Sequence, residues 1–506
     1  MFTRVQAAAL TGVQVASVWV EADVSDGLPT FSMVGYLSSE VREAQDRVRT
    51  ALRNLGIAMP PKKITINLAP TDIRKEGARY DLPIAAAILA AGNYIPENSL
   101  KETMILGELG LDGQVRHITG VLPSVIHAKE SGCRICIVPM DNLREASVVK
   151  EMLVVGVAHL EQMIEFFRSG EIPDRKEEIS EKAEDEKLDF SDICGQEAVK
   201  RAAMIAVSGF HNLLLIGPPG SGKSMLARRI PTLLPELTEE ECMEISKIYS
   251  VAGLLPEDSG LIHNRPFRAP HHTATPQALA GGGKIPKPGE ITLAHKGILF
   301  LDELPEFSKR SLEILRQPLE EHKICISRSN ATYEFPAHFL LTAAMNPCPC
   351  GFYPDMNRCA CSATEVIHYR NRISQPLLDR MDVCVEAPAV SYLELKGQKN
   401  SSLSSKEIRN TVKRVQNIQR QRYSKLPISF NSELSSKYVE TYCVLDRDAG
   451  KVMQKAFEKL QLSARGYHRL LKVARTIADM EEETLIRQRH IQEAICYRSL
   501  DKKYWK

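Results

Sequence analysis

The sequence has little excess charge of either sign and few aromatic residues. Its 65 lysines and arginines nearly balance its 63 aspartates and glutamates, which gives a formal net charge of +2. A chain this close to neutral has no overall field that attracts nucleic acid or membrane, so any DNA contact must come from local patches. Aromatic residues make up 6% of the chain, whereas its hydrophobic share of 43% is ordinary for a globular protein.

Long hydrophobic runs are also missing. The most apolar helical stretch, 81–92, is far shorter than the roughly 20 residues that cross a bilayer, so we expect no membrane partner. The first ten residues lack an apolar core after a basic start, and we therefore expect no secretory signal and a cytoplasmic protein. In that setting the twelve cysteines predict reduced thiols or a metal site, not a disulfide framework.

One abrupt change in composition divides the chain. Residues 171–187 are almost all charged and cannot bury apolar area, which is typical of a solvated linker. A length of 506 residues predicts two to four domains. We expect an N-terminal domain at 1–170, the linker at 171–188, a second domain at 189–400 and a C-terminal domain at 401–506.

Strand and helix signals alternate through the first two domains, which predicts an α/β fold. The candidate strands are 16–22, 63–68, 212–217, 297–301 and 339–344. The last three are continuously apolar and are separated by helical segments, as in a parallel sheet that is covered on both faces. Residues 40–55 and 81–92 have helical patterns, and helical signals dominate from 404 to 497.

A glycine-rich segment between a strand and a helix has the spacing of a phosphate-binding loop. It consists of Gly217, Pro218, Pro219, Gly220, Ser221, Gly222, Lys223 and Ser224. The glycines let backbone N–H groups converge on phosphates, and the following helix directs its positive end toward them. We expect Lys223 to reach the β- and γ-phosphates of ATP and Ser224 to ligate Mg²⁺.

Polar residues follow the next two apolar strands, at the edge where parallel sheets bind ligands. Asp302 and Glu303 end one strand, and Asn346 ends the other. We expect Asp302 to hold Mg²⁺, Glu303 to orient or deprotonate the attacking water, and Asn346 to hydrogen-bond the γ-phosphate and that water. An acidic turn and a capping asparagine are the alternative interpretations.

Two later arginines are candidates for stabilising the transferred phosphoryl group. Arg380 is our candidate for a finger supplied by a neighbouring subunit, and Arg465 is our candidate for a second phosphate sensor. In isolation, each is read first as a surface or ion-paired arginine.

Several long motifs together resemble the Mg-chelatase-like AAA+ family. They are GPPGSGKS at 217–224, FRAPHHT at 267–273, the glycine- and acid-containing segment 281–307, NPCPCG at 346–351 and QPLLDRMD at 375–382. The long form with an N-terminal α/β domain is similar to the competence-associated ComM/YifB group. This resemblance implies an ATP-hydrolysing homo-hexamer with a C-terminal helical lid, and it assigns Asn346, Arg380 and Arg465 as sensor, finger and second sensor.

The same resemblance implies helicase and branch-migration activity on single-stranded or branched DNA. The alternative is a Mg-chelatase-type motor or chaperone that remodels a protein. Residues 106–139 resemble the Lon-protease fold, whose active members use a serine and a lysine. The serine-bearing segment reads 75–81 here and has no serine, and Pro123 stands at the lysine position, so we expect a scaffold and not a protease.

Four cysteines, Cys348, Cys350, Cys359 and Cys361, have a CxC-x₈-CxC spacing. Four thiolates in one short loop can close a tetrahedral zinc site, which would pin the loop just after Asn346. Four reduced cysteines in a surface insertion is the alternative. A second pair, Cys133 and Cys136, lies in a strand pattern and reads as core packing.

Three further segments carry charged or metal-binding side chains. His271 and His272 are expected to point to opposite sides of an extended segment, which disfavours a shared metal ion. Residues 324–339 predict a hairpin with a turn at Ser329–Asn330, and its Lys323 and Arg328 either meet DNA phosphates in a pore or are merely solvated. The basic helix 406–422 reads mainly as a solvated face, with DNA contact as the alternative.

Overall fold

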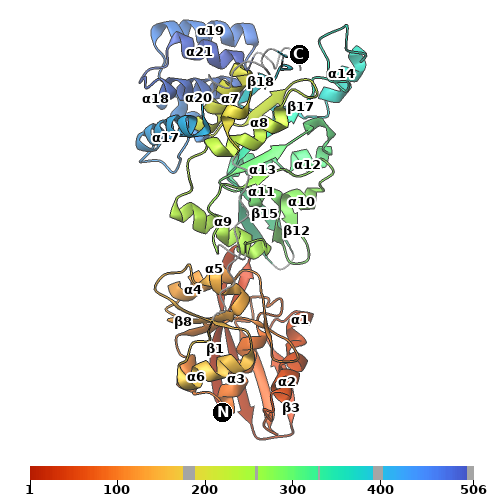
Figure 1. Cartoon of the computed structure of the whole chain (residues 1–506), viewed down its shortest axis with the longest axis vertical. Helices are drawn as coiled ribbons and strands as arrows, with labels where there is room; N and C mark the ends of the chain where they lie inside the picture. The colour runs from red at the N-terminus through yellow and green to blue at the C-terminus, as the bar shows by residue number, and fades with distance from the viewer. Residues whose placement is uncertain (175–187, 257–259, 329–330, 391, 393–402, 499–506) are drawn as a thin grey trace.

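Two β-sheets and a terminal set of helices organise the chain, as Figure 1 shows from one end of the molecule to the other. The computed structural model describes residues 1–174, 188–256, 260–328, 331–390, 392 and 403–498. Most of the predicted linker, the domain boundary at 400/401 and the Ser329–Asn330 turn lie outside these residues. The predicted fold class, α/β with a parallel sheet and a helical C-terminal part, is confirmed.

The N-terminal domain is built on a seven-stranded mixed sheet with the order β3-β4-β2-β1-β5-β8-β9. Its strands are β1 (Phe2–Thr11), β2 (Gln14–Ser25), β3 (Thr30–Val34), β4 (Lys63–Ala69), β5 (Thr103–Ile105), β8 (Ile135–Pro139) and β9 (Leu153–Val157), with a small ribbon of β6 (Glu108–Leu109) and β7 (Val115–Arg116). Its helices are α1 (Ser39–Arg42), α2 (Ala44–Asn54), α3 (Asp81–Ala91), α4 (Val121–Glu130), α5 (Leu143–Ala146) and α6 (Leu160–Ser169).

Helix α3 forms the centre of this domain because it is apolar on every side. All of its residues are buried, including Asp81, whose carboxylate receives two hydrogen bonds from Arg47 at 2.7 and 2.9 Å. The helix predicted at 40–55 is interrupted at Glu43, where α1 ends and α2 begins. Cys133 and Cys136 are both buried in the core, as the strand pattern predicted.

Buried polar side chains lie around the positions where Lon-type proteases carry their serine and lysine. Lys75 is fully buried, and its ammonium group donates to the carbonyl of Pro70. Arg79 is also buried and donates to the Thr119 carbonyl and to the hydroxyl of Ser124, which lies one residue after Pro123 in α4.

The second domain contains a five-stranded sheet in which every neighbouring pair is parallel. The order is β11-β14-β17-β10-β18, with bounds β11 (Phe267–Arg268), β14 (Ile298–Leu301), β17 (Leu340–Met345), β10 (Leu213–Ile216) and β18 (Val383–Glu386). Short antiparallel ribbons are β12 (Gly281–Gly282) with β13 (Lys287–Pro288), and β15 (Lys323–Ser327) with β16 (Thr332–Pro336).

Helices surround this parallel sheet and continue into the C-terminal part. Those of the second domain are α7 (Glu197–Gly209), α8 (Lys223–Arg229), α9 (Glu239–Ala252), α10 (Pro276–Ala280), α11 (Glu290–Leu293), α12 (Lys309–Glu313), α13 (Arg316–Glu321), α14 (Ala363–Arg370) and α15 (Gln375–Leu378). The C-terminal helices are α17 (Ser405–Arg422), α18 (Ser436–Tyr442), α19 (Arg447–Leu460), α20 (Ala464–Met480) and α21 (Gln488–Cys496). Within the described residues, no helix combines the length and the apolarity that a bilayer crossing needs.

The C-terminal helices share one core with α7 and with side chains from strands β14, β17, β10 and β18 of the parallel sheet. The buried amides of Gln416 and Gln419 on α17 donate to the last carbonyls of α7, those of Val207 and Ser208, at 3.1 and 3.0 Å. On the same helix, Arg409 donates to the Thr232 carbonyl at 3.0 Å. The basic helix therefore packs against the second domain. Its other basic side chains are exposed except Arg422, which pairs with the buried Asp479 of α20.

The N-terminal domain docks on α9 of the second domain (Figure 1). The hydroxyl of Ser250 donates to Glu145 at 2.7 Å, and the Ser250 carbonyl accepts from the amide of Gly120 at 2.9 Å. Burial raises the pKa of the Glu145 carboxyl. Since both polar partners are almost inaccessible to water, this contact fixes the two domains at one point.

Candidate nucleotide-binding site

The phosphate-loop sequence folds as a tight turn between β10 and α8. Gly220 and Gly222 have φ values of +74° and +80°, a left-handed conformation that glycine adopts without steric cost. A Cβ atom on Gly217 would lie 2.1 Å from the carbonyl oxygen of Ala387, at the end of β18. Only glycine fits this close approach, and the loop thereby directs the N-terminus of α8 toward the edge of the sheet.

Lys223 is held over the loop by its own backbone. Its ammonium group donates to the carbonyls of Gly217 and Pro218 at 2.8 and 2.9 Å, and to Asn346 Oδ1 at 3.2 Å. Burial lowers the pKa of Lys223, and the carboxylates of Asp302 and Glu303 partly offset this shift. A phosphate group beside the ammonium would stabilise its charged form, so the arrangement fits a nucleotide.

The magnesium candidates lie side by side. Ser224 Oγ donates to Asp302 Oδ2 at 2.5 Å, which joins the first turn of α8 to the end of β14. A hydroxyl and a carboxylate are oxygen ligands of the kind that Mg²⁺ prefers, and both side chains line the same cavity. Ser224 and Asp302 would therefore supply oxygen ligands to a magnesium ion bound with a nucleotide.

Glu303 lines the same cavity, and its carboxylate contacts His272. Its backbone has a φ of +50°, a conformation that costs a non-glycine residue about 1–2 kcal/mol and is concentrated at functional sites. Its amide donates to Asp302 Oδ1 at 2.9 Å, while its own side chain is 57% exposed and lies 3.3 Å from His272 Nδ1. Water can reach this carboxylate, as a general base requires.

The sheet order explains why these groups meet. Strand β17 lies between β14 and β10, so the residues that follow the three strands share one edge of the sheet. Asn346 follows β17 and contacts Lys223, which follows β10. The structure thus brings together Lys223, Ser224, Asp302, Glu303 and Asn346 at one edge of the parallel sheet.

The sequence did not single out Arg228 or the position of the two histidines. Arg228 lies on α8 one turn after Ser224 and lines the cavity formed by Ser224, Asp302 and Glu303. His271 and His272 line the same cavity, and their ring centroids are 4.0 Å apart, so the prediction that they point to opposite sides is wrong. The segment turns after Pro270 and does not continue as a strand, which removes the alternation of side chains.

Arg380 and Arg465 lie around a different cavity, between the sheet and the C-terminal helices. Arg380 donates to the Pro376 carbonyl at 2.5 Å and pairs with Glu320, whereas Arg465 is exposed in the first turn of α20. Further bases line this cavity, namely His322, His468, Arg469 and Lys472. The phosphate-loop residues of the same chain do not line it, so the structure does not bring either arginine to Lys223.

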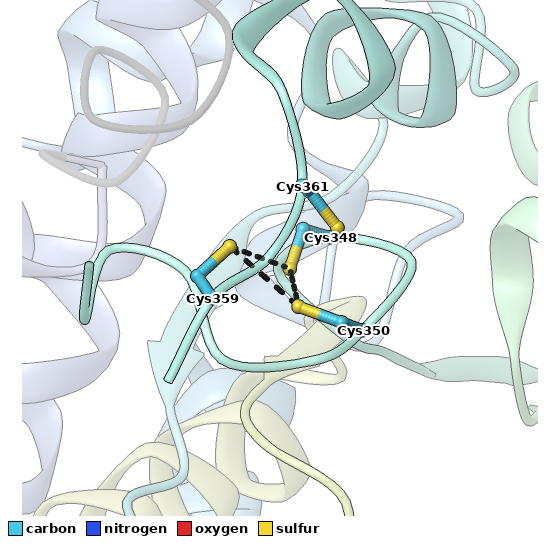
Figure 2. A group of neighbouring side chains, drawn as sticks. All are labelled: Cys348, Cys350, Cys359 and Cys361. Atoms are coloured by element: carbon cyan, nitrogen blue, oxygen red, sulfur yellow. Dashed lines mark hydrogen bonds between the residues drawn. The ribbon is translucent and has the colours of Figure 1, made fainter. Parts of the chain in front are cut away.

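The four cysteines between β17 and α14 converge, as Figure 2 shows. Their sulfur atoms all lie within 4.8 Å of one another. Cys348 Sγ is 3.4 Å from Cys350 Sγ and 3.8 Å from Cys359 Sγ, and the last two are 3.5 Å apart. A tetrahedral ZnS₄ centre with bonds of about 2.3 Å places its sulfurs roughly 3.8 Å apart. The cluster therefore has the ligand number and spacing of a zinc site.

The predicted hairpin of β15 and β16 is present, but one of its basic residues is already paired. Lys323 Nζ lies 2.8 Å from Glu334 Oε1 across the two strands. Arg328 is exposed at the end of β15, and its guanidinium donates to the Gly283 carbonyl at 3.3 Å. Of these two residues, Arg328 is the better placed to meet a phosphate.

Three family models match most of the chain. Residues 189–395 match the family described as magnesium chelatase, subunit ChlI, and residues 402–498 match the C-terminal region of that subunit. Residues 20–142 match a further family described as subunit ChlI of Mg-chelatase.

Several relatives match the chain over almost its whole length, and a chelatase subunit matches part of it. The chain is 44% identical over 497 residues to competence protein ComM of Haemophilus influenzae, which covers 97% of this chain and 96% of that protein. It is 42% identical over 494 residues to the uncharacterized protein YifB of Escherichia coli, which covers 98% of this chain and 96% of that protein. The 38 kDa magnesium-chelatase subunit of Rhodobacter capsulatus is 24% identical over 176 residues, or 31% of this chain and 50% of that subunit. The chain therefore belongs to the Mg-chelatase-like AAA+ ATPases, in the ComM/YifB family.

Proposed function

We propose that this AAA+ ATPase is a ring-forming motor that acts on single-stranded or branched DNA in the cytoplasm during recombination of incoming strands. The observation that carries the motor is the convergence of Lys223, Ser224, Asp302, Glu303 and Asn346 at one edge of a parallel sheet. The DNA substrate is supported by full-length similarity to a competence protein.

In this proposal Lys223 holds the β- and γ-phosphates of ATP, and Ser224 and Asp302 hold the magnesium ion that neutralises their charge. Glu303 accepts a proton from the attacking water, and Asn346 fixes that water beside the terminal phosphate. His272 lies beside Glu303 and orients its carboxylate. ATP binding then depends on Lys223, Ser224 and Asp302, whereas hydrolysis depends on Glu303 and Asn346.

The positions of Arg380 and Arg465 support the assembly of several subunits into a ring. Arg380 and Arg465 share a cavity that the phosphate loop of their own chain does not line. An arginine finger must touch the γ-phosphate, so these side chains complete the site of a neighbouring subunit. We propose a homo-hexamer, which the family resemblance implies, with Arg380 acting as the finger and Arg465 as the second sensor.

Hydrolysis rates with and without DNA test the substrate. ATPase activity should rise with single-stranded or branched DNA and should lose this stimulation as salt increases, because phosphate contacts release counterions. Arg328→Ala should weaken the stimulation, whereas Arg134→Ala, at an exposed arginine of the N-terminal domain, should not. Absence of both stimulation and gel retardation with every DNA form would refute the DNA proposal.

A protein-remodelling motor of the Mg-chelatase type is the second candidate. It is favoured by the chelatase-subunit families that match all three parts of the chain. Such a motor would hydrolyse ATP at a rate that depends on a protein partner and not on DNA. The DNA assay above therefore separates the two candidates.

We also propose that Cys348, Cys350, Cys359 and Cys361 bind one Zn²⁺. Support comes from the four converging sulfurs, whose separations match a tetrahedral thiolate site. Elemental analysis of purified wild type and Cys359→Ser is the test. Metal-free wild type would refute the zinc site without affecting the ATPase assignment.

A further inference from the structure

We infer that the cysteine loop is a metal-dependent clamp on the phosphate loop, and that Gly351 is the residue through which it acts. This inference rests on the zinc site proposed above. It adds a function for the metal, because a filled site would set the affinity of the neighbouring site for ATP.

Gly351 lies against the phosphate loop without any intervening space. It has a φ of +86°, and a Cβ atom built on it would lie 2.3 Å from Pro219 Cδ and 2.8 Å from Pro219 Cγ. Those distances are far below van der Waals contact, so the backbone of Gly351 itself packs on the proline ring. The cysteine loop and the phosphate loop are therefore in direct contact.

Cys348 and Cys350 fix the turn that contains Gly351. Cys350 immediately precedes it, and the amide of Gly351 donates to the carbonyl of Cys348 at 3.0 Å. The amide of Tyr353 donates to Cys348 Sγ at 3.4 Å. A metal bound to Cys348 and Cys350 would thus fix the turn that carries Gly351.

The start of the cysteine loop contacts the nucleotide site as well. Asn346, two residues before Cys348, accepts a hydrogen bond from Lys223 at 3.2 Å. Lys223 is bonded in turn to the carbonyls of Gly217 and Pro218, next to Pro219. The loop therefore contacts the phosphate-binding turn at two points, Asn346 and Gly351, with the cysteine cluster attached to both.

The rest of the loop has no regular secondary structure. The described chain between β17 and α14 contains turns and bends but neither helix nor strand. Arg370 holds its first part, by donating to the Pro347 carbonyl at 3.0 Å, whereas the segment that carries Cys359 is closed by local bonds, such as that from the Cys359 amide to the Asp355 carbonyl at 2.8 Å. A metal that joins both halves of the loop would remove much of its conformational freedom in one step. Loss of the metal would release Gly351 from Pro219, and the phosphate loop would be less well ordered for ATP.

Two variants and one control separate the clamp from the metal site. Gly351→Ala disturbs the contact with Pro219 and leaves all four thiols in place, whereas Cys359→Ser removes one ligand. Gly132→Ala is the matched control, because Gly132 has a φ of +84° and no neighbour within 4 Å of a built Cβ atom. It carries the same backbone strain at a site remote from the nucleotide.

For each protein we would measure bound zinc, the affinity for a fluorescent ATP analogue with Mg²⁺, and the melting temperature. Gly351→Ala should keep its zinc and bind nucleotide at least tenfold more weakly than Gly132→Ala. Removing zinc from the wild type with a chelator should weaken nucleotide binding, and adding zinc back should restore it. That reversible experiment needs no variant to fold.

The outcomes distinguish the two proposals. Metal-free wild type would overturn the zinc site and, with it, the metal-dependent clamp. Zinc-containing wild type that keeps its nucleotide affinity after chelation would overturn the clamp and leave the zinc site intact. Wild-type nucleotide affinity in zinc-loaded Gly351→Ala would overturn the role assigned to Gly351.

Discussion

Replacing Glu303 by glutamine should separate ATP binding from ATP hydrolysis. The amide has the shape of the carboxylate but cannot accept a proton from water at neutral pH. The Ser224–Asp302 hydrogen bond does not involve the Glu303 side chain, and neither do the bonds of Lys223. Phosphate and magnesium contacts should therefore survive in Glu303→Gln.

The expected loss can be set from the role of a general base. Such a group contributes roughly 10²–10⁴ in rate, or about 2.7–5.4 kcal/mol of activation free energy. Because the Glu303 side chain is 57% exposed and its side-chain ion pair is with His272, replacing its carboxylate should hardly change folding stability. We would measure phosphate release at saturating ATP and, separately, binding of a fluorescent ATP analogue.

Glu306→Gln provides a matched control three residues along the chain. Its carboxylate pairs with Arg372 at 2.9 Å on the surface, and such pairs contribute about 0–1 kcal/mol. Turnover in Glu306→Gln should stay near that of the wild type. Wild-type turnover in Glu303→Gln, with the protein folded and ATP bound, would refute the catalytic role of this residue.

Two further predictions concern the subunit and domain contacts. Arg380→Ala should bind MgATP but lose about 10³-fold or more in turnover. Mixing this variant with Lys223→Ala should restore some phosphate release. Absence of recovery at every mixing ratio would contradict action between subunits. Ser250→Ala should destabilise the docking of the N-terminal domain by about 1–3 kcal/mol, because Glu145 loses a buried hydrogen bond of 2.7 Å. Calorimetry would detect this loss as earlier unfolding of the domain. Ser147→Ala, at an exposed serine whose hydroxyl donates to the Leu143 carbonyl of α5, should have little effect; equal melting of both variants would contradict the docking contact.

The parts of the site that depend on local sequence could be predicted. The phosphate loop requires its glycines at fixed spacing, and the strands beside it are buried along their whole length and almost wholly apolar because both faces of the parallel sheet are covered. Once those strands are aligned, the residues after them must share one edge. Lys223, Asp302 and Asn346 were therefore predictable as neighbours.

Contacts made by irregular or distant segments were not predictable in the same way. The close approach of the His271 and His272 rings depends on a turn after the two-residue strand β11, which has no periodic signal. The common cavity of Arg380 and Arg465 forms only because α20 folds back beside the sheet. The packing of Gly351 on Pro219 likewise depends on how the cysteine loop closes.

The most direct test of the account is a titration of wild type and Lys223→Ala with MgATP under conditions in which both are folded. Lys223 is half-buried and bonded to two carbonyls of the phosphate loop, so we expect its loss to cost about 2–5 kcal/mol of binding free energy, or roughly 30-fold to several thousandfold in affinity. A markedly weaker titration of the variant would support the nucleotide site. Equal affinity of the two proteins would contradict it.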